Sequence, residues 1–342
     1  MGSRYTIALD AMGGDHGPRV VVPAALAAVA EFPDIDLVLV GGEPVIAAAL
    51  KRTGAGSDGR ISIRHASQSV EMDDPPSQVL RSKRDSSMRV ALDLVRDGAA
   101  DACVSAGNTG ALMAMARFVL KTLPGIDRPA IISALPTEKG HTHVLDLGAN
   151  VESTSRHLFE FAVMGSELVS AVDDIERPSV GLLNIGQEDI KGNEQVKEAA
   201  RLLSASSLHY IGFVEGDDIY QGTANVVVCD GFVGNVALKS SEGVARMISD
   251  LMRDEFERTF FSRLVGFLAR PMLRSLAGRM DPRSYNGASF VGLRGIVIKS
   301  HGGADVVAFK RAIMEAVAEI RKNVPERISE RIASVLVEKE AV

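Results

Sequence analysis

Six short polar segments recur along the chain, each placed where an apolar run ends. The first covers residues 10–18 (DAMGGDHGP) and the second covers residues 105–111 (SAGNTGA). Glycines let such loops approach a ligand closely. The second loop leads into a predicted helix, whose first N–H groups and positive dipole end attract anions. Ordinary helix capping by Asn108 or Thr109 accounts for the same residues, so both interpretations stand.

The other four segments have the same design. They are residues 146–150 (DLGAN), 184–194 (NIGQEDIKGNE), 230–235 (DGFVGN) and 301–305 (HGGAD). In open α/β sheets, ligands bind beyond the carboxyl ends of the strands. We therefore expect the six loops to line one cleft with backbone amides, Asn amides and a few cations. Lys191 supplies a charge there, whereas Asn193 fits equally well as a helix cap.

Apolar runs and amphipathic helical patterns alternate along the chain. Strands are predicted at 5–9, 37–40, 61–64, 102–104, 130–134, 142–145, 179–183, 210–213, 226–229 and 295–299. Helices are predicted at 20–31, 86–96, 109–120, 155–171, 193–203, 234–257 and 305–322. This alternation indicates βαβ units and a largely parallel sheet covered on both faces. We expect one α/β catalytic domain over residues 1–342, with a projecting helical region at 240–285.

Composition excludes several classes of protein. The net charge of -6 and the pI of about 5.7 argue against a protein that binds nucleic acid with its whole surface. Cys103 and Cys229 lie in apolar runs without zinc-type spacing, so we expect no metal and a reduced, cytoplasmic compartment. The start of the chain is not a signal peptide, and no run of about 18 apolar residues predicts a transmembrane helix.

Two common catalytic motifs are absent from the sequence, and a third does not occur where it would bind a dinucleotide. The sequence has no GxxxxGK[ST] loop for nucleotide phosphates and no GxSxG nucleophile elbow. No GxGxxG follows the first predicted strand with an acidic residue placed for ribose. We therefore predict no nucleotide, nicotinamide or other cofactor.

Residues 258–279 (RTFFSRLVGFLARPMLRSLAGR) carry five arginines and no acidic residue within an acidic protein. Pro271 predicts a break into two short helices. Apolar bulk surrounded by arginines is typical of an interfacial membrane helix, and also of a surface that docks an acidic carrier. A dimer-interface helix pair explains the pattern too. The contact residues that we predict are Phe260, Phe261, Arg263, Leu264, Phe267, Leu268, Arg270 and Arg274.

Taken together, the motifs resemble the bacterial phosphate acyltransferase family, the acyl-ACP:phosphate acyltransferases. The resemblance rests on IALDAMGGDHGP, SKRDSSM, SAGNTGALM, DLGAN, KGNE, EGDDIYQGTANVVVCDGFVGN and HGGAD, in this order, and spans residues 5 to 322. It implies a three-layer α/β/α fold of the isopropylmalate-dehydrogenase-like type, related to phosphotransacetylases. It also implies a homodimer that transfers a fatty acyl group from acyl-carrier protein to inorganic phosphate at the start of phospholipid synthesis. Peripheral contact with the inner face of the membrane and a downstream glycerol-phosphate acyltransferase as partner are further expectations.

This chemistry needs positioning rather than a covalent intermediate or a metal. Phosphate is a competent nucleophile, and a thiol with a pKa of about 8.5 leaves readily. Orientation lowers the barrier by about 7–11 kcal/mol, and each oxyanion donor adds about 2.7–4 kcal/mol. The predicted catalytic residues are Asn108, Lys191, Asn235 and His301, with His16 and His301 as candidate proton shuttles. The predicted substrate-binding residues are Asp10, Gly14, His16, Lys83, Ser86, Ser105, Gly107, Thr109, Asn150, Asn193, Asp230 and Gly231.

Two other functions remain open. One is a short-chain phosphotransacetylase that uses acyl-CoA, and the other is a non-catalytic, membrane-associated scaffold for lipid enzymes. A scaffold has no need of polar loops at so many strand ends. A dicarboxylate dehydrogenase is disfavoured because the sequence offers no metal-binding acidic cluster together with a cofactor loop.

Overall fold

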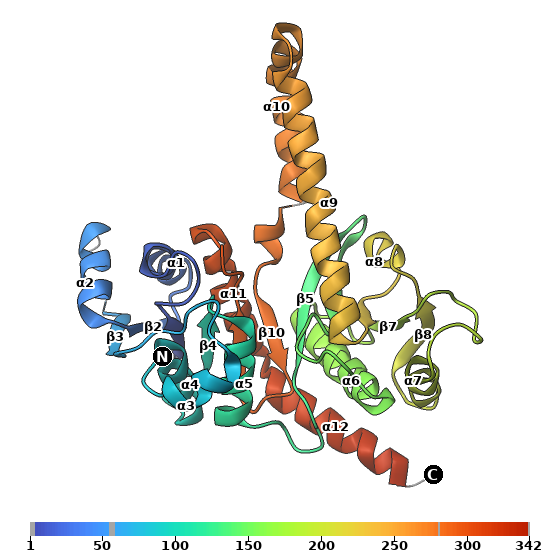
Figure 1. Ribbon diagram of the computed structural model, residues 1–342. Helices are drawn as coiled ribbons and strands as arrows, with labels where there is room; N and C mark the ends of the chain where they lie inside the picture. Colours follow the sequence, from blue (N-terminus) through green and yellow to red (C-terminus); the bar gives the residue numbers. More distant parts are fainter. Residues whose placement is uncertain (1–3, 55–58, 280, 341–342) are drawn as a thin grey trace.

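The computed structural model describes residues 4–54, 59–279 and 281–340, without the side chains of 274–277, 279, 282 and 336–340. Most of the GAGSDG loop at 54–59 lies outside the described residues. The described chain forms one 11-stranded sheet with helices on both faces, and a long helical hairpin projects from this body (Figure 1). The α/β class with a mostly parallel sheet is confirmed.

The sheet has two halves. In the first half, neighbouring strands are parallel, in the order β3 (Ile61–His65), β2 (Ile35–Gly41), β1 (Tyr5–Asp10), β4 (Ala102–Ser105) and β11 (Ile296–Lys299). The second half, also parallel within itself, consists of β6 (Gly140–Leu145), β9 (Val226–Val228), β7 (Ser179–Leu183) and β8 (His209–Val214).

Two strands join the halves and reverse the direction of the sheet. β10 (Ala288–Val291) is antiparallel to β11, β5 (Ala130–Thr137) is antiparallel to β10, and β6 is antiparallel to β5. After these three antiparallel pairings, the strands of the second half run opposite to those of the first. The carboxyl ends of the two halves therefore lie at opposite edges of the sheet.

Helices cover both faces because the strands are apolar on both sides. Ile7 and Leu9 of β1 pack with α1 (Pro18–Glu31) and α11 (Val306–Lys322), whereas Ala8 belongs to a core on the other face. That second core includes α4 (Ser87–Arg96) and α5 (Thr109–Leu120). In the second half, α6 (Ser155–Val172), α7 (Glu194–Ser204) and α12 (Val324–Glu340) share one core.

Some elements were not predicted. The sequence prediction lacks β10, whose four residues are too few for a clear period. It also lacks α2 (Glu43–Arg52), α3 (Pro76–Ser82), α8 (Asp218–Gln221), η1 (Pro282–Tyr285) and α12. The predicted break at Pro271 is wrong, because α10 (Phe260–Arg279) continues through it. A proline removes one internal hydrogen bond, and here the turns before and after it remain helical.

The projecting hairpin consists of α9 (Gly231–Glu257) and α10 (Figure 1). Thr259 Oγ1 accepts a hydrogen bond from the N–H of Ser262 at 3.0 Å, which begins α10. Gly266 lets the helices approach closely, since a Cβ there would lie 3.0 Å from the ring of Phe256. The hairpin exposes apolar side chains, including Phe260 at 85%. Among the described residues, no helix is long and apolar enough to cross a membrane.

Candidate active site

The loops after β1, β4 and β11 meet at one edge of the sheet. Ser105 Oγ donates to Asp10 Oδ2 at 2.7 Å, and the N–H of Asp15 donates to the carbonyl of Gly302 at 2.9 Å. The N–H of Ser300 bonds the carbonyl of Ser105 at 2.9 Å. We call residues 10–17, 105–110 and 299–305 the first loop group. Three of the six predicted loops are thus brought together.

Glycines allow this close approach. A Cβ on Gly13 would lie 2.5 Å from Asp10 Oδ2 and 2.8 Å from the N of Gly107. Gly14 has a φ of 81°, and a Cβ there would lie 2.8 Å from both Ala106 Cβ and the carbonyl oxygen of Gly302. The sequence GG therefore holds the first loop against the other two.

Lys299 places a positive charge inside the first loop group. Its Nζ donates to the carbonyl of Ala106 at 3.3 Å and to that of Ser300. Burial lowers the pKa of Lys299 to about 8, opposed by the charges of Asp10 and Asp15 and assisted by that of Lys239. Within the described chain, no carboxylate forms an ion pair with Lys299. A buried cation bonded only to carbonyls favours the arrival of an anion.

Asp10 is the buried acid of the same group. Burial raises the pKa of Asp10 above its ordinary value, and hydrogen bonds from the hydroxyls of Ser87 and Ser105 oppose that rise. The carboxyl group thus organises Ser105, whose Oγ also accepts the N–H of Gly107 at 3.1 Å. Asp10, Ser105 and Gly107 form one hydrogen-bonded unit beneath the start of α5.

Asn108 caps α5 and fastens a neighbouring segment. Its Oδ1 accepts the N–H of Ala111 at 2.9 Å, and its Nδ2 donates to the carbonyls of Met72 at 2.7 Å and Asp74 at 3.3 Å. Lys83 pairs with Asp74 at 3.8 Å. The side chain of Asn108 is therefore largely engaged in structure. The first two N–H groups of α5, from Thr109 and Gly110, have no acceptor within the helix and can meet a ligand.

Ser86 and the two histidines lie at the margins of this group. Ser86 is buried and caps α4 by accepting the N–H of Arg89 at 3.3 Å. His301 Nδ1 accepts the N–H of Gly303 at 3.1 Å, which leaves the proton of the neutral ring on Nε2. His16 is exposed in the first loop. Ser86 thus has a structural role as a helix cap. Of the two candidate proton shuttles, His301 is the one whose ring is held by a hydrogen bond.

The loops after β6 and β9 form a second loop group, residues 146–150 and 230–235. Asp146 is buried and accepts the N–H groups of Ile131, Ala149 and Asn150, the last at 2.7 Å. The N–H of Gly231 donates to the carbonyl of Asn150 at 2.8 Å. A Cβ on Gly231 would lie 2.5 Å from that oxygen, so only glycine fits.

α9 begins in this second loop group. Asp230 caps the helix by accepting the N–H of Val233 at 2.8 Å. Asn235 follows one turn later, exposed and beside Gly148, where a Cβ would lie 3.5 Å from Asn235 Cβ. Exposed apolar side chains on these loops and on the loop after β7 form what we call the apolar rim: Val151, Ile185, Ile190, Phe232, Val233 and Val236.

The loop after β7 carries Lys191 and Asn193. Asn193 caps α7 by accepting the N–H of Val196 at 2.9 Å. The carbonyl of Lys191 accepts Asn184 Nδ2 at 3.3 Å, while Lys191 itself is exposed. Among the described residues, Lys191 makes no ion pair, and its ammonium remains available to solvent or ligand.

The expectation of one cleft needs correction, because direct contacts place the loops in separate groups. The reversal of the sheet through β10 and β5 puts the carboxyl ends of β6, β9 and β7 at the far edge. α9 links the groups, since it begins at the second group and carries Lys239, whose charge lowers the pKa of Lys299. The helical rise from Asp230 to Lys239 is about 13 Å.

Two site residues were missed by the sequence prediction. The sequence prediction treated Lys299 only as the end of a strand. It treated Lys239 only as a residue of the helix that follows the loop at 230–235. A lysine that ends a buried apolar strand, directly before a glycine-containing loop, is the signal that identifies Lys299. Nothing in the sequence shows that the charge of Lys239 reaches Lys299, because that depends on the course of α9.

The chain is similar to proteins of a known family. Residues 5–327 match the family described as fatty acid synthesis protein. The phosphate acyltransferase of Alkalilimnicola ehrlichii is 62% identical over all of both chains, and that of Methylococcus capsulatus is 63% identical over 96% of this chain and 97% of the other.

Among solved structures, a phosphotransacetylase from Streptococcus pyogenes has a TM-score of 0.65 at 19% identity, covering 94% of this chain and 95% of the other. A branched-chain phosphotransacylase from Enterococcus faecalis has a TM-score of 0.57 at 13% identity, covering 92% and 99%. These likenesses confirm the predicted fold. The extent of the identity to the curated relatives shows that the chain belongs to the phosphate acyltransferase family of enzymes.

Proposed function

We propose that this chain transfers a fatty acyl group from acyl-carrier protein to inorganic phosphate and releases acyl phosphate. The observation that carries the proposal is the buried ammonium of Lys299 in the first loop group, bonded only to carbonyl oxygens. A phosphate held there meets this charge and the first N–H groups of α5. Both interactions favour an anion and need neither metal nor nucleotide.

The transfer step follows from the bound anion. A phosphate oxygen attacks the thioester carbonyl carbon, a C–O bond forms, and the charge moves to the carbonyl oxygen. When the C–S bond breaks, the electron pair leaves with the sulfur, and the thiolate takes a proton from solvent. His301 Nε2 is the candidate donor to the oxyanion, because it lies in the loop group that would hold the phosphate. Asn235 lies in the second loop group and is a candidate contact for the acyl donor instead. The engaged side chain of Asn108 supports positioning rather than direct donation.

The apolar rim supports a long acyl chain as the transferred group. Phe232 and Val236 flank Asn235 on the first turns of α9, and both are exposed. α9 runs from this rim towards the buried lysine, so one extended substrate can contact both loop groups. The short-chain alternative with acyl-CoA would leave this apolar surface unused.

The projecting hairpin is the proposed contact with membrane, carrier and partner subunit. Phe260, Phe261, Leu264, Phe267 and Leu268 are exposed there. Arg270 lies over the ring of Phe267 at 5.2 Å, and Arg263 Nε donates to the carbonyl of Glu257 at 3.1 Å. The side chain of Arg274 lies outside the described residues. Apolar surface beside arginines fits a peripheral site on the inner face of an anionic membrane, an acidic carrier protein, and a homodimer contact. A downstream glycerol-phosphate acyltransferase, as the enzyme that consumes acyl phosphate, is a further partner for this cytoplasmic surface.

An assay of thiol release tests the function directly. Long-chain acyl-ACP should release thiol only when inorganic phosphate is present, and acetyl-CoA should react far more slowly. Lys299→Met should slow the phosphate-dependent release of thiol by about 100–1000-fold, whereas the matched variant Lys197→Met, which removes a surface partner of Glu194, should not. An acyl-ACP that stays intact with phosphate and the wild-type chain refutes the proposal, and a preference for acetyl-CoA selects the alternative.

Flotation with vesicles tests the hairpin. Wild type should float with vesicles that contain anionic lipid, and a Phe260→Ser/Phe261→Ser variant should remain at the bottom of the gradient. Phe118→Ser is the matched control, because Phe118 is exposed on α5 away from the hairpin. If the wild type floats neither with vesicles that contain anionic lipid nor with vesicles of neutral lipid alone, the membrane proposal is refuted.

A further inference from the structure

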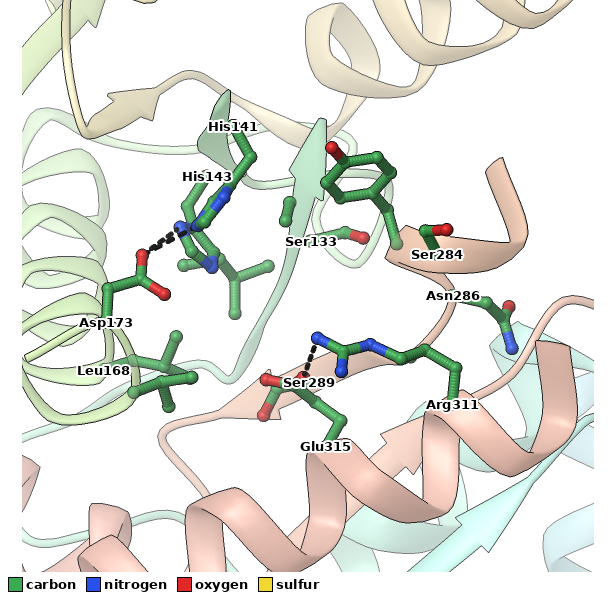
Figure 2. Close-up of a pocket in the computed structure, with 15 residues that line it drawn as sticks. Ser133, His141, His143, Leu168, Asp173, Ser284, Asn286, Ser289, Arg311 and Glu315 are labelled. Carbon is green, nitrogen blue, oxygen red and sulfur yellow. Dashed lines mark hydrogen bonds and ion pairs between the residues drawn. The ribbon is translucent and has the colours of Figure 1, made fainter. Parts of the chain in front are cut away.

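A polar cavity lies between the middle of the sheet and two helices, and one of its lining residues, Asn286, is hydrogen-bonded to Ser300 and His301 of the first loop group. It measures about 80 Å³ and is lined by residues of β5, β6, η1, β10, α6 and α11 (Figure 2). Its polar side chains include His141, His143, Asp173, Arg311 and Glu315. The mechanism above uses none of these residues.

Two histidines and one aspartate converge on one side of this cavity. His141 and His143 are two residues apart on β6, so both point to the same face of the strand. Asp173 follows the last turn of α6. His141 Nε2 lies 2.9 Å from Asp173 Oδ2, and His143 Nδ1 lies 3.6 Å from the same oxygen. Figure 2 shows the two rings turned towards the carboxylate.

One atom of this cluster lacks the partner that its burial requires. His143 is 6% exposed, and its Nδ1 has no hydrogen-bond partner among the described residues. Buried polar atoms are almost always satisfied. A purely structural His–Asp pair accounts for His141, whose Nε2 is bonded to Asp173, but leaves the buried nitrogen of His143 unexplained.

The spacing fits a divalent transition-metal ion. In a tetrahedral zinc site with bonds of about 2.0–2.1 Å, ligand atoms lie about 3.3 Å apart. The two His–Asp distances lie on either side of this value, and all three candidate ligand atoms lie within 4.8 Å of one another. Two imidazoles and one carboxylate suit Zn²⁺ better than Mg²⁺ or Ca²⁺, which prefer oxygen.

The rest of the cavity tolerates a cation. Arg311 brings a positive charge, but its guanidinium faces Glu315 at 3.7 Å, and that carboxyl group offsets it. The volume of about 80 Å³ leaves room for a water molecule as a fourth ligand. Tyr285 also lines the cavity, with its ring centre 6.3 Å from that of His141.

We propose that His141, His143 and Asp173 bind one divalent transition-metal ion of the Zn²⁺ type, with water in the fourth position. The site joins the start of β6 to the end of α6, and it borders η1, through which the chain returns from the projecting hairpin to the sheet. The ion clamps β6 to the end of α6. This proposal does not depend on acyl transfer, because the metal ion takes no part in that reaction.

The test uses the full chain freed of metal by a chelator and then dialysed. Competition with a zinc-binding dye should give one tight Zn²⁺ site per chain, and Co²⁺ should give the visible absorption of a four-coordinate ion. His141→Ala and Asp173→Asn should each weaken Zn²⁺ binding by well over ten-fold, because loss of even an outer partner costs about 10–100-fold. His209→Ala is the matched control, since His209 is exposed on β8. It should bind Zn²⁺ like the wild type.

Thermal unfolding gives a second measurement. Zn²⁺ should raise the Tm of the wild type and of His209→Ala, and it should leave the Tm of His141→Ala and Asp173→Asn unchanged. Stoichiometric binding that is lost with His141 or Asp173 supports the site. A wild type that binds neither ion, or ligand variants that bind as tightly as the control, overturns it.

Discussion

The two loop groups both lie where parallel strands end, and they differ in their surroundings. The first is closed and polar, with Lys299 and Asp10 buried among glycines that admit no side chain. The second has a buried hydrogen-bonded core around Asp146 but opens onto the exposed Phe232 and Val236. A buried charge recruits an anion, whereas exposed apolar surface recruits a chain or a partner. This contrast is the reason for proposing that phosphate binds at the first group and the acyl chain at the second.

Replacing Lys299 tests the role of the first loop group and has the largest expected effect. Lys299→Met should lower kcat/KM for phosphate by about 100–1000-fold, because the anion loses the buried charge that it meets. The melting temperature should not fall, since the substitution also removes a buried charge without an ion-pair partner. Steady-state kinetics with varied phosphate measure the effect. Normal phosphate kinetics in this variant would indicate that the anion binds at another loop.

Gly14 tests whether the first loop group depends on close backbone contact. Gly14→Ala should lower the free energy of unfolding by about 2 kcal/mol, because it combines a φ of 81° with a Cβ 2.8 Å from Ala106 and Gly302. Denaturant titration measures this change. Gly243→Ala is the control: nothing lies within 4 Å of its Cβ position in α9, so it should stabilise by about 0.5–1 kcal/mol. Equal effects of the two substitutions would contradict the proposed packing.

The pH dependence separates binding from stability at Lys299. Its pKa is lowered by burial to about 8, so above pH 8 the ammonium loses its proton and kcat/KM for phosphate should fall about ten-fold per pH unit. Stability should change in the opposite direction. Between pH 8 and 10.5, the ordinary pKa of a lysine, the unfolded chain binds more protons than the folded chain, so the free energy of unfolding rises with pH.

Lys299→Arg serves as the control for this profile. Arginine keeps its proton throughout this range, so the fall in kcat/KM and the rise in stability should both disappear. Parallel kinetic and denaturation series across the same pH values measure the two trends. Identical profiles for wild type and variant would assign the titration to another group.

Phe232 tests the second group, with the smallest expected effect. Phe232→Ala should lower kcat/KM for a long-chain acyl donor by about ten-fold, because its ring is only partly covered before substrate binds. The KM for phosphate and the rate with a short-chain donor should stay the same. Val45→Ala, on the exposed side of α2, is a matched apolar control. An equal loss for short and long donors would remove Phe232 from the acyl path.

Local signals in the sequence predicted most elements and the members of each loop group. The helix at 109–120 has its predicted bounds because Asn108 caps it and the chain leaves the helix at Lys121, whose φ is 65°. The arrangement of the loops was not accessible in the same way. It depends on β10, four residues long, whose antiparallel pairing reverses the second half of the sheet.

The missed site residues have the same physical origin. Lys299 ends a strand, and its burial arises from neighbours nearly 200 positions earlier, such as Ala106 at a separation of 193 residues. Lys239 affects the pKa of Lys299 through its charge, although the two residues lie far apart in the sequence. The cluster of His141, His143 and Asp173 combines one strand with the end of a helix about 30 residues later. Local patterns identify residues that can do chemistry, whereas long-range packing decides which of them meet.

The position of β11 bears on how the chain matures. This strand lies between β4 and β10 in the middle of the sheet, although it comes from residues 296–299. A ribosome must therefore synthesise nearly the whole protein before the pairing of Val297 with Cys103 is available. Until then the amino-terminal strands have an open edge in the newborn chain, a template for unwanted pairing. A nonsense codon anywhere upstream of Ile296 would thus release a fragment that lacks a central strand of the sheet rather than a peripheral one.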